Sequence, residues 1–192
     1  TASYDATIFD WMNSDEETFS NSLRLEHGLS QILRYGENPD QPSALYGDQK
    51  HTGPSVVHAN VLAGKPLSYN NLMDAAAALE LVLDLHASTS MPSAAIIKHA
   101  NPCGAAVATT LISAFQQAWA CDPLAAFGGI VAASGNIDNE LASIIAEGQK
   151  FLEVIVAPSF ADEAIETLST RWKNVRLLAV GNQVRQSEWK QM

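Results

Sequence analysis

A regular alternation between short apolar runs and amphipathic segments, from about residue 70 to residue 180, constrains the fold more than any other feature. Apolar positions recur at three- and four-residue spacing over 70–86, which predicts a helix with Asn70 or Asn71 as its cap. Beyond it the pattern predicts strands at 94–98, 130–133, 153–157 and 175–180, and helices that begin at 109 or 110 and that span 138–147 and 162–168. Strands that alternate with helices indicate an α/β protein: a layered α-β-α sheet with parallel crossovers, helices on both faces and ligands outside the strand ends.

The first third of the chain follows a different pattern. Residues 4–12 are expected to form a short helix, and Ser14 with Glu17 has the spacing of a capping box, although an acidic loop fits the same residues. From 19 to 62, short extended segments are interrupted by turns that contain Gly and Pro, which favours strands and loops over long helices. We therefore divide the chain into a connector, one lobe, and a polar tail or point of truncation, at 1–18, 19–180 and 181–192.

Composition excludes several classes of function. Of the 192 residues, 47% are hydrophobic and 17% are charged, a balance typical of a globular protein with one sizeable core or two small lobes. The net charge of −10, with only 11 Lys and Arg, argues against nucleic-acid binding, which requires clustered cations. No apolar run approaches the ~18 residues of a membrane span, and the first residues lack the pattern of a signal peptide. We expect a protein that binds neither nucleic acid nor membrane.

Two cysteines, Cys103 and Cys121, allow at most one disulfide. Neither has the close Cys or His spacing of a zinc site, so no metal is predicted. Free thiols in a reducing compartment are the simpler interpretation, and a cytoplasmic location is expected.

A Lys-His pair stands at the end of an apolar run and directly before a turn. Side chains alternate between the two faces of a strand, so Lys98 and His99 can serve one substrate only where the strand ends. Pro102 cannot donate a ladder hydrogen bond, and Gly104 permits a backbone bend or the close approach of a ligand. A solvated lysine beside a partly buried histidine is the alternative interpretation. A strand end, a rigid turn and a group that titrates near neutral pH together favour chemistry here.

Three other clusters mix polar side chains with turn formers. The first is an Arg-Tyr pair in which the fork of Arg34 suits phosphate and the ring of Tyr35 suits a heterocycle, although a surface turn explains it as well. In the second, the amide of Asn71 offers a ligand both a donor and an acceptor, or it simply caps a helix. In the third, the backbone at Gly128 either binds a ligand or marks tight entry to a strand.

Four ordered motifs resemble the transformylase part of the family that joins AICAR (5-aminoimidazole-4-carboxamide ribotide) transformylase to IMP cyclohydrolase. The motifs are Arg-Tyr-Gly-Glu-Asn-Pro at 34–39, Gly-Lys-Pro-Leu-Ser-Tyr-Asn-Asn at 64–71, Lys-His-Ala-Asn-Pro-Cys-Gly at 98–104, and Asp-Pro at 122–123 with Phe-Gly-Gly at 127–129. One departure is Asp40, where the family usually has His, which puts a role for that side chain in doubt.

The resemblance implies formyl transfer from 10-formyltetrahydrofolate, as co-substrate, to the 5-amino group of AICAR. His99 matches the family's proton acceptor, and Lys98 matches the residue that stabilises charge on the formyl oxygen and the folate leaving group. The nucleotide contacts implied are Arg34, Tyr35, Asn71, Gly128 and Glu153. In the family the site is shared across a homodimer, with Arg34, Tyr35 and Asn71 from the subunit opposite to Lys98 and His99.

The resemblance also implies a cytidine-deaminase-like fold for the lobe at 19–180, and a connector at 1–18 that follows a cyclohydrolase domain. Because a second lobe would supply the folate contacts, the chain alone is expected to be inactive, and a silent lobe for dimerisation or nucleotide binding is the alternative. A zinc nucleobase deaminase is a third hypothesis, but Asn101 and Ala106 stand where that chemistry requires Glu and Cys.

Overall fold

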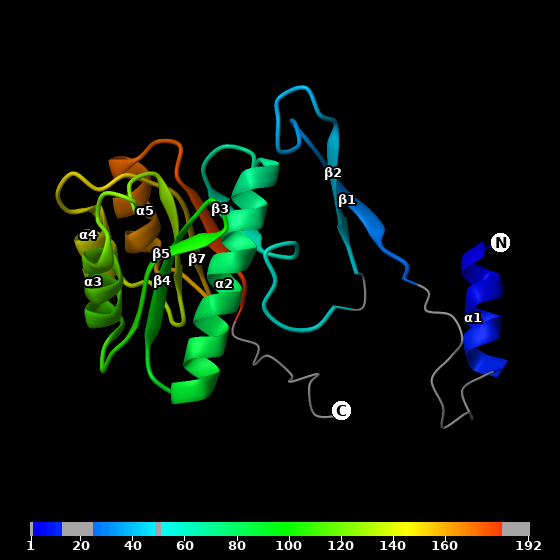
Figure 1. Cartoon of the computed structure of the whole chain (residues 1–192), viewed down its shortest axis with the longest axis horizontal. Helices are drawn as coiled ribbons and strands as arrows, with labels where there is room; N and C mark the ends of the chain where they lie inside the picture. The colour runs from blue at the N-terminus through cyan, green and yellow to red at the C-terminus, as the bar shows by residue number, and fades with distance from the viewer. Residues whose placement is uncertain (1, 13–24, 49–50, 182–192) are drawn as a thin grey trace.

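The computed structural model describes residues 2–12, 25–48 and 51–181, and its core is one sheet between two layers of helices (Figure 1). Its elements in chain order are α1 Ala2–Met12, β1 Gly28–Leu33, β2 Ser43–Gly47, β3 Asn60–Ala63, α2 Tyr69–Thr89, β4 Ser93–Lys98, β5 Asn101–Val107, α3 Leu111–Cys121, β6 Gly129–Ala133, α4 Asn139–Ala146, β7 Leu152–Ala157, α5 Asp162–Arg171 and β8 Arg176–Ala179. The predicted helices and strands of residues 70–180 are therefore confirmed, with boundaries that shift by a few residues.

The main sheet has six strands in the order β3-β8-β7-β6-β4-β5. Strands β6, β7 and β8 are parallel and are joined through α4 and α5, which confirms the parallel crossovers. The sheet is nevertheless mixed, because β4 runs antiparallel to both β5 and β6, and β3 runs antiparallel to β8. The strand β5 was not predicted. Pro102 is tolerated in it because β5 lies at the edge of the sheet, where the ladder has an open side.

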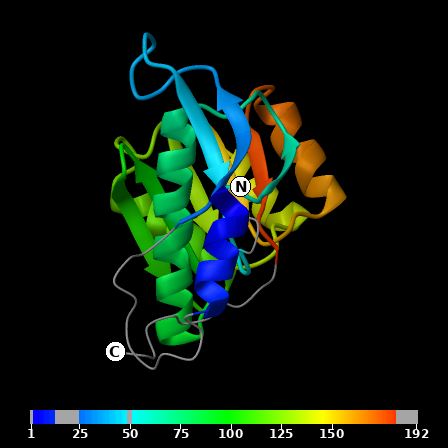
Figure 2. The ribbon, with the colours of Figure 1, turned by 90° about the vertical axis from the view of Figure 1, so that its right-hand side faces the viewer.

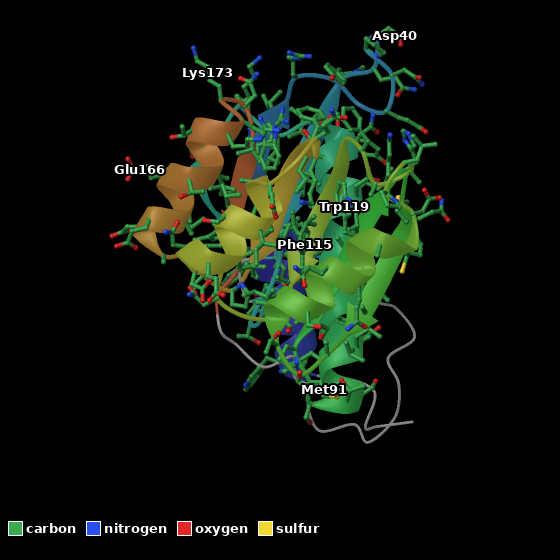
Figure 3. All side chains as sticks on the ribbon, turned by 90° about the vertical axis from the view of Figure 1, so that its left-hand side faces the viewer. Asp40, Met91, Phe115, Trp119, Glu166 and Lys173 are labelled. Carbon is green, nitrogen blue, oxygen red and sulfur yellow. The ribbon has the colours of Figure 1, made fainter. Side chains whose placement is uncertain are left out.

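Helices cover both faces of the sheet, as the alternating pattern predicts. Successive residues of β4 face opposite ways, so Ile96 joins the core beneath α3, α4 and α5, while Ile97 joins the core beneath α2. Figure 3 looks onto the three-helix side, where Phe115 and Trp119 of α3 are labelled, and their rings lie 6.2 Å apart. Figure 2 looks from the opposite side and shows α2 in front of the sheet.

Local capping chemistry explains where most helices begin. Thr110 and Asp138 accept hydrogen bonds from backbone N–H groups of α3 and α4, as their positions predict. The predicted cap of α2 is wrong, since neither Asn70 nor Asn71 precedes the helix. Ser68 is the cap, and its hydroxyl and the Asn71 side chain form a reciprocal capping box.

The hairpin of β1 and β2 stands on the α2 side of the sheet (Figure 1). Buried Leu33 and half-buried Leu45 attach the hairpin to the α2 core. Helix α1 confirms the helix expected at 4–12, whereas the capping box expected at 14–17 lies outside the described residues, as does the tail from 182 onward. Across the described ranges, no helix is long and apolar enough to cross a bilayer. The division into connector, lobe and tail stays a prediction.

Candidate functional site

The Lys-His pair lies where β4 turns back into β5. Lys98 is the last residue of β4 and Asn101 is the first of β5, so the hairpin loop is His99 and Ala100 alone. Both loop residues have left-handed backbone angles, with φ of 54° and 57°. A two-residue hairpin with positive φ at both central positions is the type I′ pattern, which normally uses Asn and Gly. The alternation of side chains between the two faces of the sheet therefore ends at Lys98. It does not place the imidazole of His99 on the face opposite to the Lys98 side chain.

A carboxylate on α2 holds this unusual turn. The backbone N–H of His99 donates to Oδ2 of Asp74 at 3.1 Å, and the N–H of Ala100 donates to Oδ1 of the same side chain at 2.7 Å. On the other side, Nδ2 of Asn101 donates to the carbonyl of His99 at 2.8 Å. The backbone of His99 is thus held at both its polar groups, while its side chain is exposed. Sequence analysis missed Asp74, because α2 carries other carboxylates, at Glu80 and Asp84, and nothing in the sequence distinguishes this one.

Lys98 reaches toward the loop that precedes β6. Its Nζ donates to the carbonyl of Phe127 at 2.8 Å, and it lies 4.0 Å from the point where a side chain on Gly128 would begin. Gly128 has φ of 77°, a conformation that favours glycine, and its N–H donates to the carbonyl of Phe151 at 2.8 Å. The structure therefore brings together Lys98 and Gly128, two predicted site residues that are distant in the sequence.

Asn71 and Glu153 also meet. Nδ2 of Asn71 donates to Oε2 of Glu153 at 2.9 Å, and Asn71 is only 5% exposed. The strand register explains why Glu153 points toward α2, because Gly129 pairs with Leu152 while Ile130 pairs with Val154. Glu153 is the extra residue of a β-bulge, an irregularity that redirects a side chain.

Arg176, at the start of β8, joins this second pair and was missed by the sequence analysis. One guanidinium nitrogen lies 3.7 Å from Oε2 of Glu153, and the others donate to the carbonyls of Lys65 and Pro66 at 3.2 and 3.4 Å. The Gly-Lys-Pro motif is thereby fastened to the sheet through its backbone, and the ammonium of Lys65 is not part of that attachment. A lone Arg before an apolar strand gave no signal of this role.

These groups lie at the same ends of four neighbouring strands. The end of β4 lies beside the start of β6, which lies beside the start of β7, and β7 in turn starts beside β8. One row of strand ends is thus formed by the carboxyl end of β4 and the amino ends of three parallel strands. The residues in this row are Lys98, Gly128, Glu153 and Arg176. A site outside strand ends stays a prediction, and this arrangement differs from the general rule, because three of the four strands contribute their amino ends.

Comparisons with known proteins fit this combination of motifs and fold. A family profile described as "AICARFT/IMPCHase bienzyme" matches residues 1–192. The chain belongs to this bienzyme family. Proteins named "Bifunctional purine biosynthesis protein PurH" are similar to it: that of Myxococcus xanthus is 46% identical over 185 residues, 94% of this chain and 34% of the relative. Those of Ruegeria pomeroyi and Anoxybacillus flavithermus are 48% and 43% identical, over 93% and 96% of this chain and 33% and 35% of their own lengths. The chain thus spans about a third of these relatives.

Two predicted site residues of this member of the bienzyme family lie apart from that row of strand ends. Arg34 and Tyr35 belong to the loop between β1 and β2, where the guanidinium carbon lies 4.7 Å from the centre of the Tyr35 ring. Among the described residues, no hydrogen bond or ion pair links either of them to Lys98 or His99. A long contact of 3.5 Å between Asn70 Nδ2 and the Glu37 carbonyl joins this loop to the start of α2.

Gly104 in the Lys-His motif of this bienzyme-family chain has a packing role. A side chain there would collide with the carbonyl oxygen of Ala118 in α3, and would lie 2.8 Å from Cβ of Cys121. The sequence suggested a backbone bend or the close approach of a ligand at Gly104, whereas in the structure the segment that approaches is α3. The glycine lets β5 and α3 come together directly behind the Lys-His turn.

The neighbouring thiol, Cys103, is poorly suited to nucleophilic chemistry. Burial raises its pKa above the ordinary value for cysteine, and the carboxylates of Asp122 and Asp74 raise it further, while the ammonium of Lys98 lowers it. Cys103 and Cys121 are both free thiols. In the part of the chain that the structure describes, no three His, Cys, Asp or Glu side chains are placed to hold a metal ion.

Proposed function

We propose that a protein carrying this chain, at the full length of its relatives, transfers the formyl group of 10-formyltetrahydrofolate to the 5-amino group of AICAR during purine biosynthesis. Membership of the bienzyme family and the printed name of the PurH relatives support this proposal. The observation that carries it is the Lys-His turn, where a cation and an imidazole from consecutive residues stand at one strand end. A reducing compartment such as the cytoplasm suits the two free thiols.

In this reaction the amine nitrogen of AICAR attacks the formyl carbon while His99 accepts the proton that the amine must lose. The amine needs a base because its lone pair is delocalised into a ring that carries a carboxamide. The resulting tetrahedral intermediate collapses with cleavage of the bond to the folate nitrogen, which takes up a proton as it leaves. Overall, one C–N bond forms and one breaks, and the proton passes from the amine to tetrahydrofolate.

Lys98 stabilises the negative charge that develops on the formyl oxygen. Its hydrogen bond to the Phe127 carbonyl fixes the ammonium with one of its three N–H donors, and no second hydrogen bond occupies it within the described residues. A positioned cation next to a developing oxyanion lowers the barrier more than a mobile one, because it does not reorganise during the reaction. The adjacent Gly128 has no side chain that could cover Nζ.

The nucleotide is proposed to contact Arg34, Tyr35, Asn71, Gly128 and Glu153, with Arg34 and Tyr35 supplied by the opposite subunit of a homodimer. Asn71 is hydrogen-bonded to Glu153 of its own chain, so we assign it to the subunit that carries Lys98 and His99, which departs from what the resemblance implies. Arg34 and Tyr35 lie on the loop between β1 and β2, and within the described residues neither is bonded to Lys98 or His99, which supports a site completed across subunits. Co-expression of an Arg34→Ala subunit with a His99→Ala subunit tests this arrangement. Activity returns in the mixed dimer if the two residues serve one site from different chains, and it stays absent if they come from the same chain.

A steady-state formylation assay of the full-length protein tests the proposed function. We expect His99→Ala to lower kcat by about 10²- to 10⁴-fold, the usual contribution of a general base, with little change in AICAR affinity. The matched control is His27→Ala, since His27 is an exposed imidazole on the segment before β1. Full activity of His99→Ala, or equal losses of turnover and binding, contradicts the base assignment.

The second candidate is a silent lobe that binds nucleotide or dimerises, and it applies to the chain by itself. The observation that favours it is that the chain covers about a third of its relatives. Calorimetric titration of the isolated chain with AICAR, beside the formylation assay, separates the two. Saturable binding without turnover supports the silent lobe, whereas turnover near that of the full-length protein excludes it.

A further inference from the structure

We propose that Asp74 is the positioning residue for His99, and that its carboxylate holds the turn from which the imidazole is presented. The inference rests on the proposed function, because it assigns Asp74 a role through the proposed base. Two contacts carry it: the N–H groups of His99 and Ala100 donate to the two oxygens of one carboxylate, at 3.1 and 2.7 Å.

The turn needs such a support because of its backbone conformation. His99 and Ala100 both have left-handed φ angles, which are unfavourable for residues that carry a Cβ and are normally left to Gly or Asn. A turn of this sequence persists only where its surroundings hold it in place, and such strain tends to accumulate at functional sites. Here the surroundings are the Asp74 carboxylate on one side and Nδ2 of Asn101 on the other.

A carboxylate is the group that fits this task. Its two oxygens each accept one N–H, and hydrogen bonds to a charged acceptor are shorter and stronger than neutral ones. Asp74 also lies on a helix that is packed against the sheet, since its neighbour Ala75 is fully buried between α2 and the sheet. The position of the turn is therefore set by α2, the helix that also carries Asn71 one turn earlier. A displacement of about 1 Å at a reacting group can cost about 10²-fold in rate, so this support bears directly on turnover.

The test measures kcat and KM in the full-length protein for Asp74→Asn and Asp74→Glu. Asparagine keeps one acceptor oxygen and replaces the other by an amide that faces an N–H, while glutamate keeps the charge but moves both oxygens. We expect kcat to fall about 10- to 100-fold in both, with KM for AICAR within about twofold of the parent. Asp84→Asn on the same helix, about 15 Å further along its axis, controls for the loss of one negative charge.

Two double variants separate positioning from a general effect on folding. Ala100→Gly should restore part of the activity of Asp74→Asn, because glycine adopts the left-handed conformation without strain. In a His99→Ala background, Asp74→Asn should have no further effect, since a residue that acts through the imidazole is silent once the imidazole is gone.

Each outcome distinguishes this inference from the proposed function. Parental kcat in both Asp74 variants, no rescue by Ala100→Gly, or a further loss in the His99→Ala background overturns the role of Asp74 while leaving the formyl transfer intact. Full activity of His99→Ala instead overturns the base assignment, whatever the Asp74 variants do. If Asp74→Asn does not fold, Asp74→Glu and the rescued double variant give the same decision.

Discussion

The side-chain amide of Asn71 donates a 2.9 Å hydrogen bond to the carboxylate of Glu153, and it joins the first turn of α2 to the bulge at the start of β7. The oxygen of the same amide accepts the N–H of Ser68 and so completes the cap of α2. Asn71 thus has a structural role whether or not it contacts a nucleotide, because an amide with little exposure must have partners in the folded chain.

Replacement of Asn71 by Ala should lower the free energy of unfolding by about 1–2 kcal/mol, because it removes half of the capping box and a hydrogen bond to a charged group. Urea denaturation measures the change. The matched control is Asn70→Ala, since within the described residues the Asn70 side chain makes one long contact, to the Glu37 carbonyl. Equal effects at the two positions would show that the Asn71–Glu153 contact contributes nothing beyond helix propensity.

Replacement of Arg176 by Lys should weaken the attachment of the Gly-Lys-Pro motif. Arginine donates to the Lys65 and Pro66 carbonyls from two nitrogens of one planar group, which an ammonium cannot reproduce. We expect a loss of about 1 kcal/mol in the free energy of unfolding, nearly independent of salt, because the 3.7 Å ion pair with Glu153 is partly exposed and contributes little. A loss that disappears at high salt would contradict this division. Lys173, which is exposed (Figure 3), provides the control in Lys173→Ala.

Gly104→Ala should destabilise the chain through packing. The new methyl group would meet the backbone carbonyl of Ala118, so β5 and α3 would have to separate, at a cost of about 1–3 kcal/mol. Gly135→Ala is the control, since a methyl group there meets only the end of the Leu111 side chain at 3.5 Å. Thermal denaturation should show a clearly lower midpoint for Gly104→Ala alone. Similar midpoints for the two variants would exclude the packing role.

Alkylation by iodoacetamide should be slow at Cys103 and should respond to the charges of Lys98 and Asp122. The thiolate is the reactive form, so a raised pKa lowers the reactive fraction at neutral pH and moves the rise in rate to higher pH. Lys98→Met removes the charge that lowers this pKa and should slow the reaction further, whereas Asp122→Asn should accelerate it. Mass spectrometry of labelled peptides measures the rate at Cys103 in each variant and in the parent protein, and exposed Cys121 serves as the internal reference for Lys98→Met. Changes of the same sign in the two variants would contradict the electrostatic explanation.

Local patterns predicted most of the elements, and the misses have local causes as well. The helix over 70–86 was found because its apolar positions repeat at helical spacing, but its cap was misplaced because Ser68 is also an acceptor, two residues earlier. The strand β5 was missed because Pro102 and Gly104 indicate a turn when they are considered alone. Pro102 is tolerated there because β5 is an edge strand, and Gly104 is needed there because β5 packs closely against α3.

In the candidate site, too, some residues could be predicted from the sequence and others only from the structure. The sequence predicted Lys98 and His99 as site residues, because a Lys-His pair at the end of an apolar run is visible without coordinates, and this stays a prediction. It did not reveal that Asp74 holds the turn or that Arg176 fastens a second motif, because each acts on backbone groups that are distant in the chain.

By itself, then, the sequence determined the layered α/β class, the approximate positions of the helices and the motifs that mark the family, since all of these depend on spacing between near neighbours. Only the tertiary structure decided which side chains meet. Asn71 reaches Glu153 across 82 positions, Lys98 reaches Phe127 across 29, and Asp74 reaches His99 across 25. Such contacts depend on strand order and strand register, because a shift of one residue in a strand turns its side chains to the other face of the sheet and moves the backbone groups that α2 and Lys98 meet.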